Sequence, residues 1–144
     1  MKLYLDNCCF NRPFDDQSDA RIRLEAEAKL AIQEDVRGGK YHLVWSYMLD
    51  YENSKNPFVE RREQIAKWRR YATEDTVETQ AIVDGARALH ECGLKKMDAL
   101  HVACAIAAGA SWFGTTDDRI LKKAGAIEGI QITDPIGFIR EVSQ

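Results

Sequence analysis

The sequence predicts an α/β protein, a three-layer α/β/α fold whose central, mostly parallel sheet lies between helices. Short apolar runs rich in β-branched and aromatic residues alternate with longer segments of helical periodicity. This alternation is typical of strand–helix–strand units. The 144 residues suit one domain, residues 1–144, which can bury a core without metal or disulfide crosslinks. Its 45% hydrophobic and 30% charged residues are those of an ordinary globular chain.

The first expected strand is KLYL, residues 2–5, and a loop is expected after Asp6. The segment DDQSD supplies Asp and Ser caps for a helix over residues 18–37, which Gly38 and Gly39 end. The expected apolar face of this helix consists of Leu24, Ala28, Ala31 and Ile32.

The middle of the chain predicts a second strand and two helical segments. Residues 41–45, YHLVW, form the strand, and Ser46 caps a helical turn that reaches Glu52. Pro57 begins another helix. The face of that helix is expected to contain Phe58, Ile65, Trp68 and Ala72.

The remaining third of the chain continues the alternation of helices and strands. A helix is expected to end near Cys92 and Gly93, after an apolar face that includes Ile82. The later expected elements are a helix over 96–108, a strand over 112–114, a helix over 117–123, a weak strand over 129–132 and a last helix from Pro135.

Hydropathy and cysteine spacing argue against a membrane protein and a zinc site, and the net charge leaves nucleic-acid binding open. The net charge of -3 does not indicate nucleic-acid binding, although local basic clusters could still provide it. No apolar stretch approaches about 18 residues, and MKLYLD lacks a signal-peptide pattern, so we expect a cytoplasmic protein that does not bind membranes. The 4 cysteines, at positions 8, 9, 92 and 104, have no zinc-site spacing and are expected to be reduced.

Four acidic residues follow strands or begin helices of the expected fold. They are Asp6, Glu52, Asp98 and Asp117. In open α/β sheets, ligands bind beyond the carboxyl ends of the strands, which is where these acids are expected. One such acid alone would be read as a helix cap. Several that converge would suit Mg²⁺ or Mn²⁺, since hard divalent cations prefer oxygen ligands.

Four segments resemble the ordered acidic motifs of PIN-domain nucleases. They are LDNCCF, SYMLDYE, KKMDALHVACA and FGTTDDRIL, which together extend over nearly the whole chain. The resemblance implies a metal-dependent endoribonuclease, similar to the toxin of a type II toxin–antitoxin pair. Its catalytic acids would be Asp6, Glu52, Asp98 and Asp117.

The resemblance also implies roles for individual acids. Asp6 and Asp98 would be the central ligands of Mg²⁺ or Mn²⁺, and Asp117 would be an outer ligand or would orient metal-bound water. Glu52 would be an outer ligand or would orient water. Asp118 stays open as an alternative to Asp117, and so does Asp50 as an alternative to Glu52.

Contacts with RNA are expected next to the acids. The candidates are Asn7, Arg12, Thr115 and Thr116. Many relatives carry Thr or Ser where this chain has Asn7. Lys95 and Lys96 could also contact phosphate, whereas the basic cluster over residues 61–70 could equally be a solvated helix face.

Other features have simpler interpretations. His101 is expected to be a packed or half-exposed helix residue, and Cys8 and Cys9 core or loop residues, since no His or Asn constellation accompanies them. The resemblance implies an antitoxin partner and a homodimer, and 3 Trp and 5 Tyr in a small chain also favour self-association. The competing interpretation is a catalytically silent PIN module that only binds a protein.

Overall fold

Five parallel strands form the centre of the computed structural model, which describes residues 1–143; Gln144, the last residue of the expected domain, lies outside the described part. The strand order is β3-β2-β1-β4-β5, and every neighbouring pair is parallel. The strands are β1 (Lys2–Leu5), β2 (His42–Ser46), β3 (Ala72–Thr76), β4 (Trp112–Gly114) and β5 (Gln131–Thr133). The predicted α/β class with a parallel sheet is confirmed.

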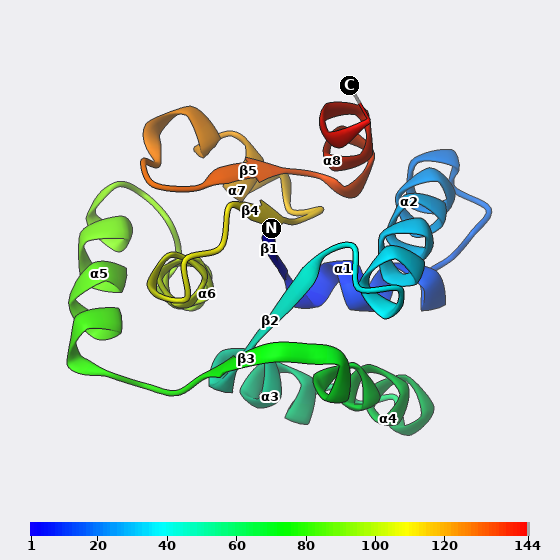
Figure 1. Ribbon diagram of the computed structural model, residues 1–144, viewed down its shortest axis with the longest axis horizontal. Coiled ribbons are helices and arrows are strands. Elements are labelled where there is room, and N and C mark those ends of the chain that lie inside the picture. The colour runs from blue at the N-terminus through cyan, green and yellow to red at the C-terminus, as the bar shows by residue number, and fades with distance from the viewer. Residues whose placement is uncertain (144) are drawn as a thin grey trace.

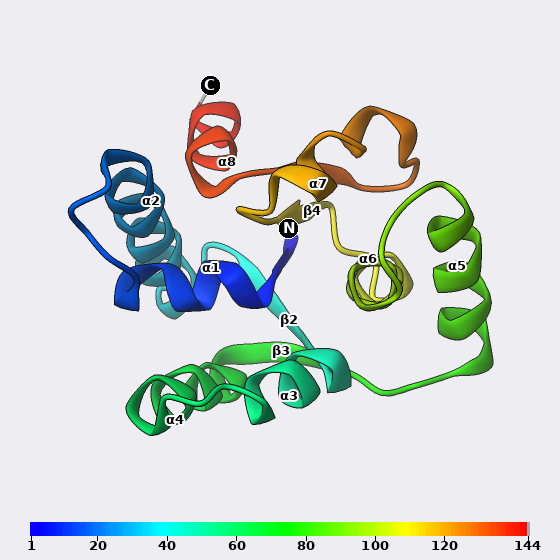
Figure 2. The same cartoon turned by 180° about the vertical axis from the view of Figure 1, so that it is seen from behind.

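Helices cover both faces of this sheet. The helices α5 (Gln80–Glu91) and α6 (Lys96–Ala107) lie on one side, and α1 (Asn7–Asn11), α2 (Ala20–Arg37) and α8 (Pro135–Val142) lie on the other (Figures 1 and 2). Near the edge strand β3 lie α3 (Tyr47–Ser54) and α4 (Val59–Ala66) (Figure 1). The short elements are α7 (Asp118–Leu121) and the 3₁₀ turns η1 (Arg12–Phe14), η2 (Lys67–Tyr71) and η3 (Ala124–Ala126).

The central strands are buried on both faces because helices cover both sides of the sheet. In β1 the side chains of Leu3, Tyr4 and Leu5 are all buried, and the same holds for residues 43–46 of β2 and for all of β4. Gly114 allows β4 to approach β1 closely, since a Cβ there would lie 2.9 Å from Leu5 Cδ2. The continuous apolar runs in the sequence therefore mark the middle of the sheet.

Polar side chains cap most of the helices, including the two caps expected before α2 and α3. Asp19 accepts a hydrogen bond from the Ile22 amide at the start of α2, and Ser46 accepts one from the Leu49 amide at the start of α3. Thr79 caps α5 in the same way, and Asp134 caps α8 directly before Pro135.

Two expected elements were wrong. The helix predicted from Pro57 ends at Ala66, and Ala72–Thr76 forms strand β3 instead of its continuation. This strand is at the sheet edge and alternates between half-buried and exposed residues, so it lacks an apolar run. The loop predicted after Asp6 is the helix α1, which Asp6 caps.

The predicted helix faces were only partly right. In α2, Ala28 and Ile32 are buried as expected, whereas Leu24 is exposed and the charged residues Glu25 and Lys29 are buried. Phe58 is also exposed, although Ile65 and Trp68 of its expected face are buried. Apolar periodicity failed in α2 because Arg12 and Arg21 pair with Glu25 and so allow its burial.

Candidate functional site

The four acidic residues of the motifs lie at the carboxyl ends of neighbouring strands. Asp6 directly follows β1, and Glu52 is in α3, which follows β2. Asp117 follows β4 and caps α7, and Asp98 lies in the first turn of α6. From β1 the chain continues to β2, which lies on one side of β1, and it later returns to β4, which lies on the other side of β1. The acids therefore surround a topological switch point, where the strand order reverses.

Asp6 is the most buried of the four carboxylates, with 5% of its surface exposed. Its Oδ1 accepts a hydrogen bond from the Asn7 amide at 2.8 Å, and its Oδ2 accepts one from Thr115 Oγ1 at 2.8 Å. Burial and the charge of Glu52 raise the pKa of Asp6, although His101 and Thr115 oppose this shift. The hydrogen bonds therefore fix the position of this carboxylate, while burial makes its charged form less favourable.

Glu52 is held by one residue from α1 and one from α6. Its Oε2 accepts a hydrogen bond from Asn7 Nδ2 at 3.0 Å, and its Oε1 accepts one from His101 Nε2 at 2.7 Å. Burial favours a higher pKa for Glu52, but these hydrogen bonds outweigh it and lower the pKa below its usual value. Asn7, expected to contact substrate, thus orients Glu52.

His101 belongs to the site, although the sequence suggested an ordinary helix residue. It is fully buried, and ligand atoms of Asp6, Glu52 and His101 all lie within 4.8 Å of one another. Its Nδ1 lies 2.6 Å from the Tyr4 hydroxyl, which lies 2.7 Å from Ser46 Oγ. Its spacing three residues after Asp98, on the same face of α6, was the signal that could have identified it.

Both ring nitrogens of His101 already have partners. Burial lowers the pKa of His101, but the hydrogen bond to Glu52 and the charge of Asp6 outweigh burial and raise it overall. Because a carboxylate only accepts hydrogen bonds, Nε2 carries the proton that points to Glu52. The imidazole therefore positions Glu52 and is not free to bind a cation.

Asp98 and Asp117 complete the acidic group. The pKa of Asp98 is raised to about 6 by its burial and by the charges of Asp6 and Asp117. Burial favours a higher pKa for Asp117, but Arg119 outweighs it and lowers the pKa, with Nη2 3.1 Å from Asp117 Oδ2. The raised pKa of Asp98 indicates that Asp6, Asp98 and Asp117 influence one another electrostatically.

The two alternative acids point elsewhere. Asp118 is exposed, and its carboxylate pairs with Arg21 of α2 at 2.8 Å. Asp50 accepts a hydrogen bond from Trp45 Nε1 at 2.9 Å and lies 3.7 Å from Arg69. The positions of the side chains thus favour Asp117 over Asp118 and Glu52 over Asp50.

A network of hydrogen bonds around Asp6 includes Thr115, Thr116 and Cys8. Thr115 is fully buried, and its hydroxyl links Asp6 to the Asp117 amide, which donates to it at 3.1 Å. Thr116 is also buried, and its amide donates to Cys8 Sγ at 3.3 Å. Since Cys8 Sγ in turn donates to Asp6 Oδ2 at 3.4 Å, these side chains brace Asp6.

The two sulfur atoms after Asp6 do not form a nucleophilic site. Cys9 is buried, and its thiol donates to the Gly114 carbonyl at 3.4 Å. Its contact with Cys8 and its burial raise the pKa of Cys9 well above the usual value, which disfavours a thiolate. The expected core role of Cys9 agrees with this position.

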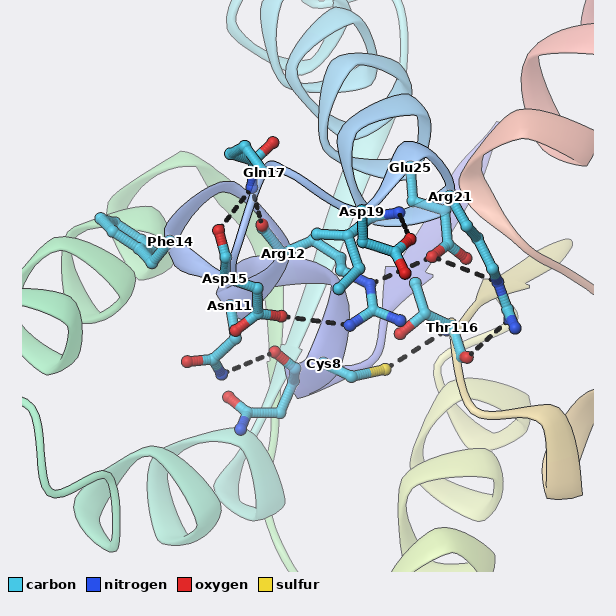
Figure 3. Close-up of polar contacts among 12 residues, drawn as sticks. Cys8, Asn11, Arg12, Phe14, Asp15, Gln17, Asp19, Arg21, Glu25 and Thr116 are labelled. Carbon is cyan, nitrogen blue, oxygen red and sulfur yellow. Dashed lines mark hydrogen bonds and ion pairs between the residues drawn. The ribbon is translucent and has the colours of Figure 1, made fainter.

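Arg12 is part of an ion-pair network on the α2 side of the sheet (Figure 3). Its Nη1 lies 3.1 Å from Asp15 and its Nε 3.1 Å from the fully buried Glu25. Arg21 extends the network by donating to the Thr116 carbonyl at 3.3 Å. The guanidinium of Arg12 thus stabilises the junction of η1 and α2, and its predicted contact with substrate remains a prediction.

The donor set of the acids fits a hard divalent cation. The charges of Asp6 and Asp117 raise the pKa of Asp98, and a cation between these carboxylates would relieve the repulsion. The ligand atoms that lie within 4.8 Å of one another are those of Asp6, Glu52 and His101. Carboxylate oxygens are also the ligands that Mg²⁺ and Mn²⁺ prefer. Asn7 Oδ1 is buried without a hydrogen-bond partner, so the site has an unused oxygen as well.

An acidic site at the switch point of a parallel sheet defines a class of α/β proteins that bind ligands at the carboxyl edge. The chain belongs to the PIN domain family, whose family model matches residues 3–126, and PIN domains are generally nucleases. This confirms the family that the acidic motifs suggested. No curated protein matches the chain.

The fold is also similar to that of a solved structure. This is a chain from the crystal structure of VapBC2 from Rickettsia felis bound to a DNA fragment from their promoter. The TM-score is 0.58 with 14% sequence identity, over 93% of this chain and 98% of that chain. At this identity the similarity establishes a shared fold.

Replacing Tyr4 by Phe tests whether the hydrogen-bond chain behind Glu52 matters. The ring can keep its stacking on Phe113, but His101 Nδ1 and Ser46 Oγ each lose a buried partner. We expect the free energy of unfolding to fall by about 1–2 kcal/mol, as measured by urea denaturation. Tyr71→Phe is the matched control, because its hydroxyl bonds only an exposed arginine; equal stability of the two variants would contradict this role.

Proposed function

We propose that the protein is a metal-dependent endoribonuclease. The observation that carries this proposal is the convergence of Asp6, Glu52, Asp98 and Asp117 at the carboxyl edge of the sheet, with the pKa of Asp98 raised by the charges of its neighbours. Membership of the PIN domain family supports a nuclease. A carboxylate cluster suits phosphodiester hydrolysis because a metal ion held by carboxylates can activate water. The reaction then needs no nucleophilic side chain.

The residues of this chain would divide the work. Asp6, Asp98 and Asp117 would hold Mg²⁺ or Mn²⁺, which when bound supplies a charge that polarises phosphoryl oxygens and lowers the pKa of water. Asn7 and His101 fix the orientation of Glu52, whose carboxylate can accept a proton from an attacking water. Thr115 keeps the carboxylate of Asp6 in one rotamer.

The biological setting that fits best is a toxin–antitoxin pair. The fold shared with a chain of a VapBC2 complex supports this proposal. We therefore propose a cytoplasmic toxin formed by one domain, which pairs with itself as a homodimer and with an antitoxin protein that covers its acidic edge. A small neighbouring gene that encodes a DNA-binding protein would support the existence of this antitoxin.

Cleavage of RNA with and without divalent cations tests the enzymatic proposal. We expect purified protein to cut single-stranded RNA with added Mn²⁺ or Mg²⁺ and to lose the activity in excess EDTA, because the carboxylates alone supply no positive charge to the phosphate. Restoration by added Mn²⁺ after EDTA treatment is the control for irreversible damage. Cleavage at full rate in EDTA would refute metal dependence, and no cleavage under any condition would favour the silent PIN module.

A further inference from the structure

A basic hollow lies directly beside the acidic site. Its volume is about 260 Å³, and it is lined by Gly93, Leu94, Lys95, Asp98, Arg119, Lys122 and Lys123. The turn between α5 and α6 forms one wall, and residues of α7 and the segment after it form the other. Asp98 belongs to both the hollow and the acidic group, so the two are contiguous.

The ammonium groups of this hollow are available to a ligand. Lys95, Lys122 and Lys123 are exposed, and none of them forms an ion pair with another residue in the 1–143 range. In the 61–70 cluster, Arg61 pairs with Asp15 at 3.1 Å and Arg69 pairs with Asp75 at 2.6 Å, whereas Arg62 and Arg70 form no ion pair within residues 1–143. In a chain with a net charge of -3, the hollow thus places three ammonium groups that have no ion pair within residues 1–143 next to the acids.

The backbone at Gly93 shapes the hollow around Lys123. Gly93 has φ +108°, a conformation that favours glycine, and a Cβ there would lie 3.0 Å from Lys123 Nζ. The absence of a side chain therefore lets the Lys123 ammonium lie over the turn. Arg119 completes the opposite side while its guanidinium stays paired with Asp117.

We propose that the basic hollow binds a backbone phosphate of the RNA strand next to the scissile phosphate. Lysine ammonium groups bind phosphate as point charges. Three ammonium groups in one concave site fit phosphate binding better than they fit the role of a solvated helix face. The RNA strand then passes from the hollow across the four carboxylates. This inference rests on the proposed ribonuclease function.

Binding of a fluorescein-labelled single-stranded RNA in EDTA, measured by anisotropy over a series of salt concentrations, tests the hollow without turnover. The test variant is Lys122→Ala/Lys123→Ala. We expect weaker binding and a slope of log affinity against log salt that is smaller in magnitude by about 0.7, since each phosphate of a single strand that the protein neutralises contributes about 0.7. In the cleavage assay, KM should rise while kcat stays within about twofold.

The matched control is Lys40→Ala/Lys67→Ala, which removes the same charge. Lys40 precedes β2 and Lys67 precedes β3, so both are at the opposite edge of the sheet from the acids. We expect this variant to keep the salt slope of the wild type. Equal slopes for the two double variants, or no RNA binding by the wild type at low salt, would overturn the proposal.

The same data separate this proposal from the proposed function. If the wild type cleaves RNA and the hollow variant binds and cleaves normally, the hollow is not a phosphate site and the ribonuclease proposal stands. If the wild type binds RNA through the hollow but never cleaves it, the hollow stands and the ribonuclease proposal fails. Circular dichroism of both variants checks that the exposed substitutions leave the fold unchanged.

Discussion

Asp6→Asn lowers the rate of RNA cleavage by at least about 100-fold, because even groups that only support a metal ligand contribute about 10- to 100-fold. Asp6 is buried, and hydrogen bonds from Asn7 and His101 hold the neighbouring carboxylate of Glu52 in its own position. Asn keeps nearly the same shape and remains a good helix cap for α1. The loss should therefore appear in cleavage kinetics at saturating Mn²⁺, with a far-UV spectrum like that of the wild type.

Asp118→Asn is the matched control for this substitution. It removes the same charge from an acid adjacent to Asp117, but the carboxylate of Asp118 is exposed and pairs with Arg21 instead of facing the site. We expect cleavage within about threefold of the wild type, as for a surface charge outside the site. A large loss in Asp118→Asn, or none in Asp6→Asn, would mean that the assignment of the acids is wrong.

Asp98→Asn should stabilise the protein in EDTA near neutral pH. Burial and the charges of Asp6 and Asp117 raise the pKa of Asp98 from 3.8 to about 6. The folded state therefore keeps a proton that the unfolded state loses, and stability falls as pH rises from about 4 to about 6. Asn cannot ionise, so the variant avoids this loss.

The expected size of this effect is modest. A shift of about two pKa units corresponds to at most about 3 kcal/mol, and because Asp98 is half-exposed, solvent screening reduces it to about 1 kcal/mol. The melting temperature in EDTA at pH 7 should then rise by about 3 °C over the wild type, as measured by calorimetry. The difference should vanish at pH 4, where Asp98 is protonated in the folded wild type. A lower melting temperature for the variant at pH 7 would show that no repulsion exists.

Much of the fold was predictable because its centre is encoded locally. The buried strands β1 and β2 are continuous apolar runs, and caps such as Asp19 and Ser46 mark where helices begin. The strand β3 escaped prediction because ATEDT is an edge strand held by pairing with β2, and its residues carry no apolar signal. Its position depends on the tertiary arrangement, which single-sequence patterns do not record.

The placement of the acids after strands and at helix starts was predictable, whereas the contacts around them were not. Asp6 and its three partners stand in ordered motifs, whereas the roles of Asn7 and His101 follow from contacts between α1, α3 and α6 that are distant in sequence. The burial of Glu25 could not be predicted from the sequence either, because the arginines that compensate its charge come from η1 and from the start of α2. Charged residues are assigned to the surface unless their partners are known.

Thermal melting with EDTA and with Mn²⁺ tests most directly whether the four acids form one cation site. A cation that binds only the folded protein stabilises it by mass action, by roughly 2.7 kcal/mol at a hundredfold excess over its dissociation constant. We predict that Mn²⁺ raises the melting temperature of the wild type by several degrees and leaves that of Asp98→Asn nearly unchanged. If Mn²⁺ fails to stabilise the wild type, or stabilises both proteins equally, the acids do not form one site and Asp6 is only a helix cap.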